Sequence, residues 1–350
     1  MEKFVTIGGK RIGVGYPAFL VAEMSANHNM DFDRAKEIIR AAKLAGADAV
    51  KLQTYTADTI TIDCENSYFQ INQGTLWDGT TLHKLYESAY TPWEWQKELK
   101  DYAETLGLVC FSSPFDETAV DFLEEMDMPA YKIASFEITD IPLIRKVARL
   151  GKPIIISTGI AYLEDIDLAV RTCLEENNTQ IILLKCTSAY PAKPESMNLR
   201  TIASLEETFH CVPGLSDHSM GSTAAIAGVA VGAKMIEKHL TLKREDGGPD
   251  ALFSMETEEF KDMCTQIRIA EQALGMVHYG LTMEQSRERE HSRSLFAVQD
   301  IAKGERLTKE NIRSIRPGFG MHPRYYEEIL GKVARKEIRK GEPMHWGLIE

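Results

Sequence analysis

The fold of this chain is decided by the segments 212–218, Val212-Pro213-Gly214-Leu215-Ser216-Asp217-His218, and 234–241, Lys234-Met235-Ile236-Glu237-Lys238-His239-Leu240-Thr241. Each is a short apolar run followed by or ending near a histidine, and the residues between them, Ser222 to Gly232, are small and typical of a helix. This order predicts two consecutive parallel strands joined by a helix. Because parallel strands end at the same edge of a sheet, His218 and His239 are expected to share one divalent metal ion. Either histidine taken by itself could instead be a core histidine with satisfied hydrogen bonds.

Apolar runs of the same kind alternate with amphipathic helical segments over most of the chain. The expected strands are Phe19 to Ser25, Ala49 to Thr54, Leu108 to Ser113, Ala130 to Ser135, Pro153 to Thr158, Ile181 to Thr187, Val212 to Asp217 and Lys234 to Thr241. Eight strands with intervening helices predict an α/β fold of the (β/α)8 or TIM-barrel type. A doubly wound sheet is the alternative, but that fold does not need polar residues at every strand end.

Polar side chains follow these strands and predict an active site on the carboxyl-terminal rim of the barrel. The rim residues are Glu23, Ser25, Asn27, Lys51, Gln53, Ser112, Ser113, Lys132, Ser135, Glu137, Ser157, Thr158, Lys185, Thr187, Ser188, Ser216, His218, Glu237 and His239. Alternation with period two predicts that Lys51 and Lys185 point into the barrel mouth. Buried lysines are costly unless they are paired with anions. Lys51, Lys132 and Lys185 together therefore indicate an anionic ligand, glutamate countercharges in the barrel, or both.

Composition places the chain among ordinary globular proteins. Its 350 residues are 44% hydrophobic, and its formal net charge of -12 argues against a nucleic-acid or anionic-membrane partner. No apolar stretch is long enough to cross a membrane, and the amino terminus lacks the apolar core of a signal peptide, so a cytoplasmic location is expected. The six cysteines have no CxxC spacing and are interpreted as reduced thiols.

Two regions depart from the simple alternation of strand and helix. The connection 55–91 is long and rich in aromatic residues, including Tyr68, Phe69 and Trp77, which predicts either a lid or wall for a ligand or a packing excursion. The expected domains are a barrel over 1–278, a charged linker over 279–292 and a small β domain over 293–350. In the last of these, the repeated Lys-Gly-Glu at 303–305 and 340–342 predicts turns between short strands.

The motifs, taken in order, resemble the sialic acid synthase family, and the tail resembles the antifreeze-like (SAF) domain of that family. The segments that carry the resemblance are Ala22-Glu23, Asn27-His28-Asn29, 45–53, 111–115, 131–137, Ser157-Thr158-Gly159, 214–218, Ile236-Glu237-Lys238-His239 and Gly247-Gly248-Pro249-Asp250. The insertion between 77 and 95, together with Lys185-Cys186-Thr187-Ser188, is most similar to the pseudaminic acid synthase branch. Two positions depart from the commoner family pattern: Met30 replaces a frequent glycine, and Ser188 replaces an asparagine found in sialic acid members.

The resemblance implies condensation of phosphoenolpyruvate with the open-chain aldehyde of an N-acetylated amino sugar. In the pseudaminic branch the sugar is 2,4-diacetamido-2,4,6-trideoxy-L-altrose and the products are pseudaminic acid and phosphate; synthesis of N-acetylneuraminate or legionaminate is the alternative. The resemblance further implies Mn2+ or Mg2+ on His218 and His239, and catalytic roles for Glu23, Lys51 and Glu137. The implied substrate-binding residues are Lys132, Ser113, Ser135, Ser157, Ser188, Ser216, Asp250 and Arg316. It also implies a domain-swapped homodimer, in which Arg316 serves the barrel of the partner.

Two other classes of function compete with this prediction. A metal-dependent aldolase or isomerase would also use histidines and carboxylates on a barrel rim, but it would not require the lysines together with the serines. A non-catalytic sugar-binding or ice-binding protein is suggested only by the tail, and such a protein has no use for the polar rim.

Overall fold

The computed structural model describes residues 4–72 and 74–350. The chain divides into two compact units, Met1–Gly275 and Met276–Glu350, and each is described by itself.

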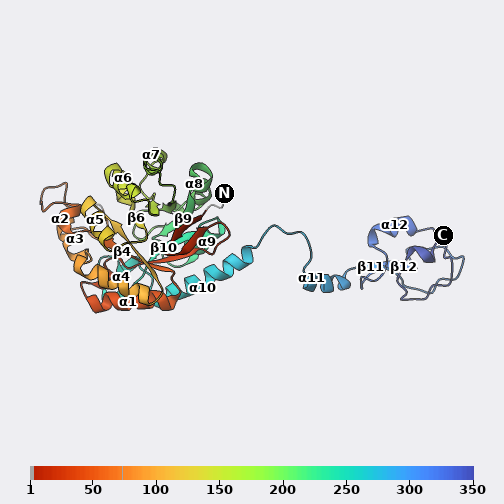
Figure 1. Ribbon diagram of the computed structural model, residues 1–350. Helices are drawn as coiled ribbons and strands as arrows, with labels where there is room; N and C mark the ends of the chain where they lie inside the picture. Colours follow the sequence, from red (N-terminus) through yellow and green to blue (C-terminus); the bar gives the residue numbers. More distant parts are fainter. Residues whose placement is uncertain (1–3, 73) are drawn as a thin grey trace. The chain divides into compact units, whose positions relative to one another are not determined.

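The first unit is a closed parallel barrel, as predicted (Figure 1). Its strands are β3 (Phe19–Glu23), β4 (Ala49–Thr54), β5 (Val109–Pro114), β6 (Tyr131–Ile133), β7 (Ile154–Ser157), β8 (Ile181–Cys186), β9 (Val212–Asp217) and β10 (Met235–His239). They pair in chain order, and β10 closes the barrel against β3 with His239 opposite Glu23. Closure in sequence order excludes the doubly wound alternative.

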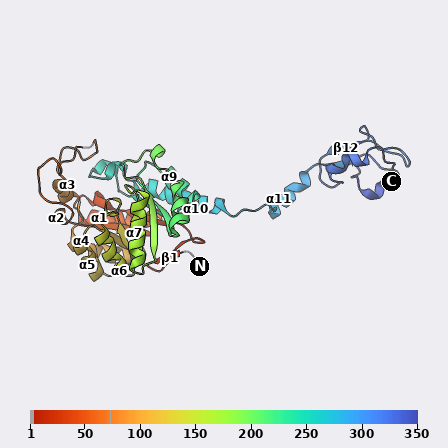
Figure 2. The same cartoon turned by 90° about the horizontal axis from the view of Figure 1, so that it is seen from above.

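Helices surround the barrel on its outside (Figure 2). They are α1 (Phe32–Ala45), α4 (Trp93–Thr105), α5 (Glu117–Glu125), α6 (Ile141–Arg149), α7 (Leu163–Glu175), α8 (Thr201–Phe209), α9 (Thr223–Ala230) and α10 (Thr257–Leu274). Helix α1 shows why these segments are helical: Asp31 caps its first turn by accepting from the Arg34 backbone N–H, and Ile38, Ile39 and Ala42 bury one face. Gly46 ends α1 at φ 92°, a conformation that glycine adopts without steric cost.

The barrel interior is apolar at its amino-terminal end and polar at its carboxyl-terminal end. Ala49, Val109, Ile155, Ile182 and Leu184 form one buried cluster inside the barrel. The hairpin of β1 (Phe4–Ile7) and β2 (Lys10–Gly13) adds Val5, Ile7 and Ile12 to that cluster, next to the first residues of several barrel strands. This apolar filling supports the polar side chains of the site from below.

The prediction that Lys185 points into the barrel mouth is wrong. Leu184 belongs to the interior cluster, and Lys185 pairs in register with Leu215, which packs against the outer helices. The Lys185 ammonium donates to the Cys186 carbonyl at 2.5 Å. The alternation of apolar and polar residues along β8 does not say which of its two faces points into the barrel. Closure of the barrel decides this, and it places Cys186 inside and Lys185 outside.

The long connection after β4 contains two short helices, α2 (Ala57–Ile60) and α3 (Leu82–Ala89). Its aromatic residues behave differently from one another. Tyr68 is 89% exposed, whereas the Trp77 indole donates to the Pro249 carbonyl at 3.0 Å and its ring lies 5.5 Å from that of Tyr190. Trp77 therefore contacts the rim, and Tyr68 does not.

The second unit begins with α11 (Met283–Glu288) and contains β11 (Ser294–Ala297), β12 (Ile312–Ile315) and α12 (Tyr326–Ile329) around its own small core. The two Lys-Gly-Glu repeats lie in turns, and Ile301 and Ile338, which precede them, bridge each other. Within residues 4–72 and 74–350, no helix is long and apolar enough to cross a membrane. The cellular location stays a prediction.

Candidate active site

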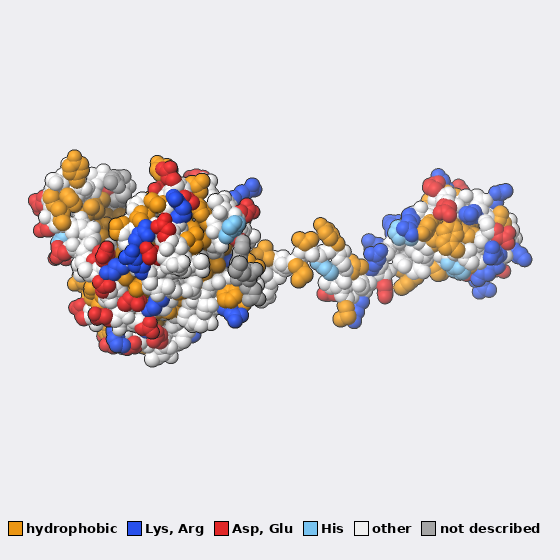
Figure 3. All heavy atoms as spheres, turned by 45° about the horizontal axis from the view of Figure 1, so that its top comes forward, with side chains coloured by type: hydrophobic (Ala, Val, Ile, Leu, Met, Phe, Trp, Pro, Cys, Tyr) orange, Lys and Arg blue, Asp and Glu red, His pale blue; other side chains and the backbone are white. Residues whose placement is uncertain are grey.

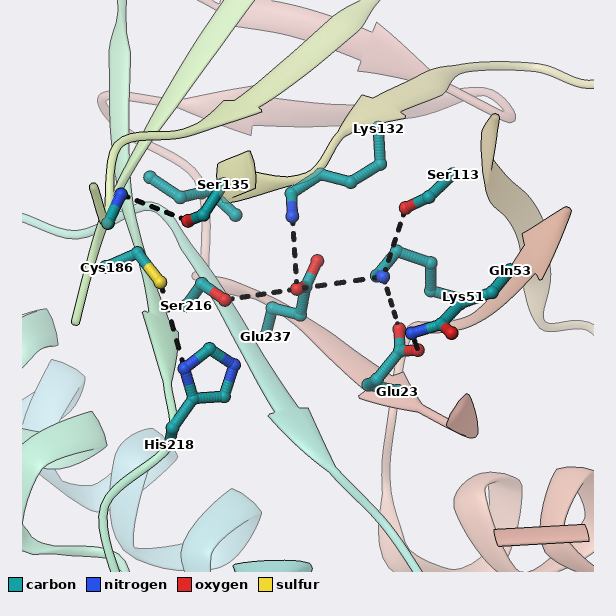
Figure 4. Close-up of polar contacts among 12 residues, drawn as sticks. Glu23, Lys51, Gln53, Ser113, Lys132, Ser135, Cys186, Ser216, His218 and Glu237 are labelled. Carbon is teal, nitrogen blue, oxygen red and sulfur yellow. Dashed lines mark hydrogen bonds and ion pairs between the residues drawn. The ribbon is translucent and has the colours of Figure 1, made fainter. Parts of the chain in front are cut away.

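The polar end of the barrel is organised around Glu237 on β10 (Figure 4). Its Oε1 atom accepts from Lys132 Nζ at 3.3 Å and from Ser216 Oγ at 3.1 Å, and lies 3.9 Å from Lys51 Nζ. Its Oε2 atom is buried and has no hydrogen-bond partner among the described residues. Burial raises the pKa of Glu237, but Lys132 and Lys51 outweigh burial and lower that pKa below its ordinary value. Glu237 is therefore an anion held between two cations.

Glu23 and Lys51 form a second, adjoining pair. Lys51 Nζ lies 2.5 Å from Glu23 Oε2 and donates to Ser113 Oγ at 3.3 Å. Burial lowers the pKa of Lys51, but Glu23 and Glu237 outweigh it and raise that pKa. Desolvation raises the pKa of Glu23 to about 7, although Lys51 lowers it. Near neutral pH the two lysines thus face one ionised and one partly protonated glutamate, which leaves room for an added anion.

The two histidines predicted as a pair do lie together. The His218 and His239 ring centroids are 5.4 Å apart, and both side chains are buried. His218 Nδ1 lies 3.1 Å from the Thr187 carbonyl oxygen, a contact that fixes this nitrogen as the donor and leaves Nε2 free. His239 Nδ1 is buried and has no partner. Two imidazoles thus each keep a nitrogen available for a ligand.

Aromatic rings enclose the histidine pair. The Tyr190 ring lies 4.5 Å from that of His218, and the Phe253 ring lies 4.9 Å from that of His239. Trp77 extends this wall through its contact with Tyr190. On the barrel side, Cys186 Sγ lies 3.8 Å from His218 Nδ1. The histidines therefore stand at the boundary between an apolar wall and the charged centre.

Glu137 and Ser157 also have buried oxygen atoms without partners among the described residues, Oε2 and Oγ respectively. Desolvation raises the pKa of Glu137 to about 7, although the Lys132 ammonium lowers it. Buried polar groups are normally hydrogen-bonded, so unpaired oxygens at one barrel mouth indicate positions that a ligand or water completes.

Most of the predicted site residues come from strand ends or the connections that follow them. Ser113, Ser157 and Ser216 are buried at strand ends. Ser135 Oγ accepts from the Gly159 backbone N–H at 3.0 Å, and the Ser135 hydroxyl also hydrogen-bonds the Cys186 thiol. Ser188 Oγ lies 3.9 Å from Cys186 Sγ. Asp250 accepts a hydrogen bond from Ser25 Oγ. Arg316 belongs to the second unit, where it is exposed.

Several residues at the centre were not assigned a role from the sequence. Glu237 was only a candidate countercharge, and Cys186, Tyr190 and Phe253 were not singled out as site residues. Glu237 could have been found from its position two residues before His239, since that spacing puts both side chains on the same face of a strand. Nothing local marks Tyr190 or Phe253, because their proximity to the histidines depends on how the loops fold over the rim.

A metal site made entirely of protein ligands is not present in the part of the chain that the structure describes, where no group of three or more His, Cys, Asp or Glu side chains has the required spacing. The donor set of this mouth is two imidazoles. Any metal ion there has to complete its coordination with substrate or water, which is the pattern of a catalytic site.

Comparison with known proteins agrees with this architecture. The NeuB family model matches residues 38–279, and the SAF domain model matches residues 292–350. The chain belongs to the NeuB family. This NeuB-family chain is 46% identical to a pseudaminic acid synthase of Campylobacter jejuni over 94% of its own length and 96% of that protein. It is 37% identical to an N,N'-diacetyllegionaminic acid synthase of the same species over 92% and 97% of the two chains.

A crystal structure of the spore coat polysaccharide biosynthesis protein SpsE of Bacillus subtilis has the same fold. It superposes with a TM-score of 0.68 at 35% identity and covers 99% of each chain. The likeness therefore extends over both units of this chain.

Proposed function

We propose that this NeuB-family chain condenses phosphoenolpyruvate with 2,4-diacetamido-2,4,6-trideoxy-L-altrose to give pseudaminic acid and phosphate. The observation that carries the choice of product is the 46% identity to a pseudaminic acid synthase over nearly the whole of both chains, against 37% to a legionaminic acid synthase. The chemistry of the barrel mouth supports the same reaction.

Phosphoenolpyruvate binds at Lys51 and Lys132 in this proposal. Both ammonium groups are buried in a protein with a net charge of -12, and both contact Glu237. The partly protonated Glu23 limits the negative charge already present, and the Ser157 hydroxyl has no partner of its own. A ligand with a carboxylate and a phosphate adds acceptors for the two ammonium groups and for the Ser157 hydroxyl. Ser113, Ser135, Ser188 and Ser216 add further hydroxyl groups around it.

A divalent metal ion, Mn2+ or Mg2+, fits the His218 and His239 pair. The buried, unpartnered Nδ1 of His239 and the carbonyl contact that orients His218 support this assignment. When bound, the ion supplies Lewis acidity toward the aldehyde oxygen of the sugar.

The protein side chains then handle binding and protons. Carbon 3 of phosphoenolpyruvate forms a bond to the aldehyde carbon, the aldehyde oxygen gains a proton, and water adds at carbon 2 before phosphate leaves. Burial raises the pKa of Glu137 to about 7, and its buried Oε2 atom has no hydrogen-bond partner among the described residues, so Glu137 is suited to take a proton from that water. Glu23 and Asp250 bind the polar groups of the sugar, and the two lysines stabilise the negative charge of the phosphate.

The aromatic wall supports a deoxygenated, diacetylated sugar. Trp77, Tyr190 and Phe253 offer apolar surface beside the histidines. Burying a methyl or acetamido group there contributes about 25 cal/mol per Å2, whereas an unpaired buried hydroxyl costs about 1–3 kcal/mol.

A second copy of the chain is proposed to close the mouth in a domain-swapped homodimer. Phe136, Ile160, Met220 and Leu252 lie on the connections after four of the strands, and each exposes between 46% and 58% of its surface. Exposed apolar side chains on one rim are typical of an interaction surface. The SAF unit carries many Lys and Arg side chains (Figure 3), opposite in sign to the acidic chain as a whole, and Arg316 among them is assigned to the partner's sugar.

The test is a coupled assay of phosphate release and product mass. The full-length protein is mixed with phosphoenolpyruvate, Mn2+ and, in separate reactions, the altrose derivative, 2,4-diacetamido-2,4,6-trideoxymannose or N-acetylmannosamine. We expect the altrose derivative to have a catalytic efficiency at least tenfold above the others, which matches the cost of one unpaired hydroxyl. Comparable efficiency with N-acetylmannosamine, or a preference for the mannose derivative, contradicts the sugar assignment and leaves the condensation intact.

A further inference from the structure

Ser25 occupies an unusual place directly after β3. Its φ is 47°, in the left-handed region, and its side chain is only 3% exposed. Non-glycine residues adopt this conformation at a cost in free energy, and such residues gather at functional sites when the surrounding contacts hold them. A glycine at this position would remove the backbone strain of the positive φ. The contacts of the Ser25 side chain therefore have to account for its presence.

The contacts of Ser25 join three residues that come from different elements. Its backbone N–H donates to Glu23 Oε1 at 3.1 Å. Its hydroxyl accepts from Gln53 Nε2 at 3.2 Å and donates to Asp250 Oδ2. Because a serine hydroxyl has a single hydrogen, these two contacts fix its direction: the amide is the donor, and the carboxylate is the acceptor.

The same network fixes the Gln53 amide. Gln53 Nε2 also donates to Glu23 Oε1 at 3.0 Å (Figure 4). Because Glu23 Oε1 and Ser25 Oγ both accept from Gln53, the amide nitrogen of Gln53, and not its amide oxygen, must face them. The Oε1 atom of Gln53 is then left without a partner among the described residues. Asp250 is held in a similar way: desolvation raises the pKa of its carboxyl group, and the Ser25 hydroxyl lowers it.

We infer that Ser25 is a positioning residue for the amino sugar: its hydroxyl orients the Gln53 amide and the Asp250 carboxyl group so that their remaining atoms bind the open-chain sugar. This inference rests on the proposed function, in which Asp250 contacts the sugar. The Ser25 hydroxyl makes no direct contact with Lys51 or Lys132. It is connected to Lys51 only through Gln53 and Glu23, so its loss is expected to act mainly on sugar binding.

The test compares Ser25→Gly with Ser25→Ala in the full-length protein. Both variants lack the hydroxyl, but only glycine relieves the positive φ. We expect both to raise KM for the altrose derivative by about ten- to hundredfold, the range for a lost hydrogen bond to a charged group. KM for phosphoenolpyruvate should stay within about twofold of the parent value, and the melting temperature of Ser25→Gly should equal or exceed that of Ser25→Ala. Calorimetric titration with the unreactive alditol of the same sugar should show the same loss without catalysis.

The exposed residue Asn177, with φ 60° after α7, provides the matched control. Asn177→Gly and Asn177→Ala change backbone strain far from the rim and should leave both KM values unchanged. A parental sugar KM in Ser25→Gly with a raised one in Ser25→Ala would mean that strain alone matters, and it would overturn the inference. Equal increases in both KM values would overturn it as well. A parent protein that releases no phosphate with any of the three sugars would instead defeat the proposed function, and this inference with it.

Discussion

Lys238 and Asp217 form a buried ion pair directly behind the two histidines. Lys238 Nζ lies 2.7 Å from Asp217 Oδ2, the two residues are register partners on β10 and β9, and their side chains are at most 1% exposed. Each residue immediately precedes a histidine of the pair, and the lysine also donates to the Ser219 carbonyl at 2.6 Å. The pair faces the outer helices while the histidines face the mouth, so it ties together the two strand ends that carry His218 and His239.

Breaking this pair on one side should destabilise the barrel strongly. Asp217→Asn or Lys238→Met leaves one buried charge without its partner, which costs about 3–5 kcal/mol. The double substitution Asp217→Leu with Lys238→Leu removes both charges and should recover part of that loss. Chemical denaturation measures the free energy of unfolding. Single variants as stable as the parent would show that the pair contributes little.

Replacing either histidine should abolish the metal-dependent reaction. His218→Ala or His239→Ala leaves a single protein ligand, so Mn2+ affinity measured by calorimetry should fall together with turnover. His210→Asn is the matched control, because His210 is exposed and its φ of 56° is tolerated by asparagine. Full metal-dependent turnover in either alanine variant rules out the assignment.

The roles of Lys51 and Lys132 can be tested against Lys185, whose side chain points away from the barrel interior. Lys51→Met and Lys132→Met should each weaken phosphoenolpyruvate binding by about ten- to over a hundredfold, since each removes a charge-assisted contact worth about 1.5–3 kcal/mol. Lys185→Met should leave that affinity unchanged, because Lys185 lies on the outer face of β8. Binding is measured by equilibrium titration with phosphoenolpyruvate alone. An unchanged affinity in Lys51→Met or Lys132→Met excludes that lysine as a ligand.

Activity should fall on the acid side of neutrality. Burial raises the pKa of Glu137 from 4.5 to about 7, so its ionised form is lost as the pH falls through 7. If ionised Glu137 accepts the proton of the attacking water, kcat/KM should decrease toward about one tenth at one pH unit below that pKa. Glu137→Gln should lower kcat/KM throughout and flatten this limb. A parent profile that is level between about pH 6 and 8 contradicts the role.

Action of Arg316 in trans can be tested with two inactive full-length variants. Arg316→Ala should lose most activity because its partner's barrel lacks the arginine, and His218→Ala should be inactive because its own barrel lacks a metal ligand. Random exchange of subunits makes heterodimers in which one barrel has all its residues, so about one quarter of parental turnover should return. Demonstrated heterodimers without any recovery would place Arg316 at the barrel of its own chain or away from the site.

The sequence by itself determined the barrel, the order of its strands and the rim at which the candidate site residues gather. Eight apolar runs with polar ends suffice for this, because burial and strand ends are properties of neighbouring residues. The pairing of His218 with His239 followed as well, since both stand at the ends of consecutive strands. Gly46 at the end of α1 was predictable for the same local reason.

Only the tertiary structure decided which face of a strand points inward and which residues converge. Lys185 and Lys51 occupy similar local patterns, yet one lies outside the barrel and the other inside. Glu237 contacts side chains from three other strands, and Ser25 joins Gln53 to Asp250, residues separated by nearly two hundred positions along the chain. In a single strand that alternates apolar and polar residues, either set of side chains could face the barrel interior. Closure of the barrel selects one of them, and it does so through contacts between residues that are distant in sequence.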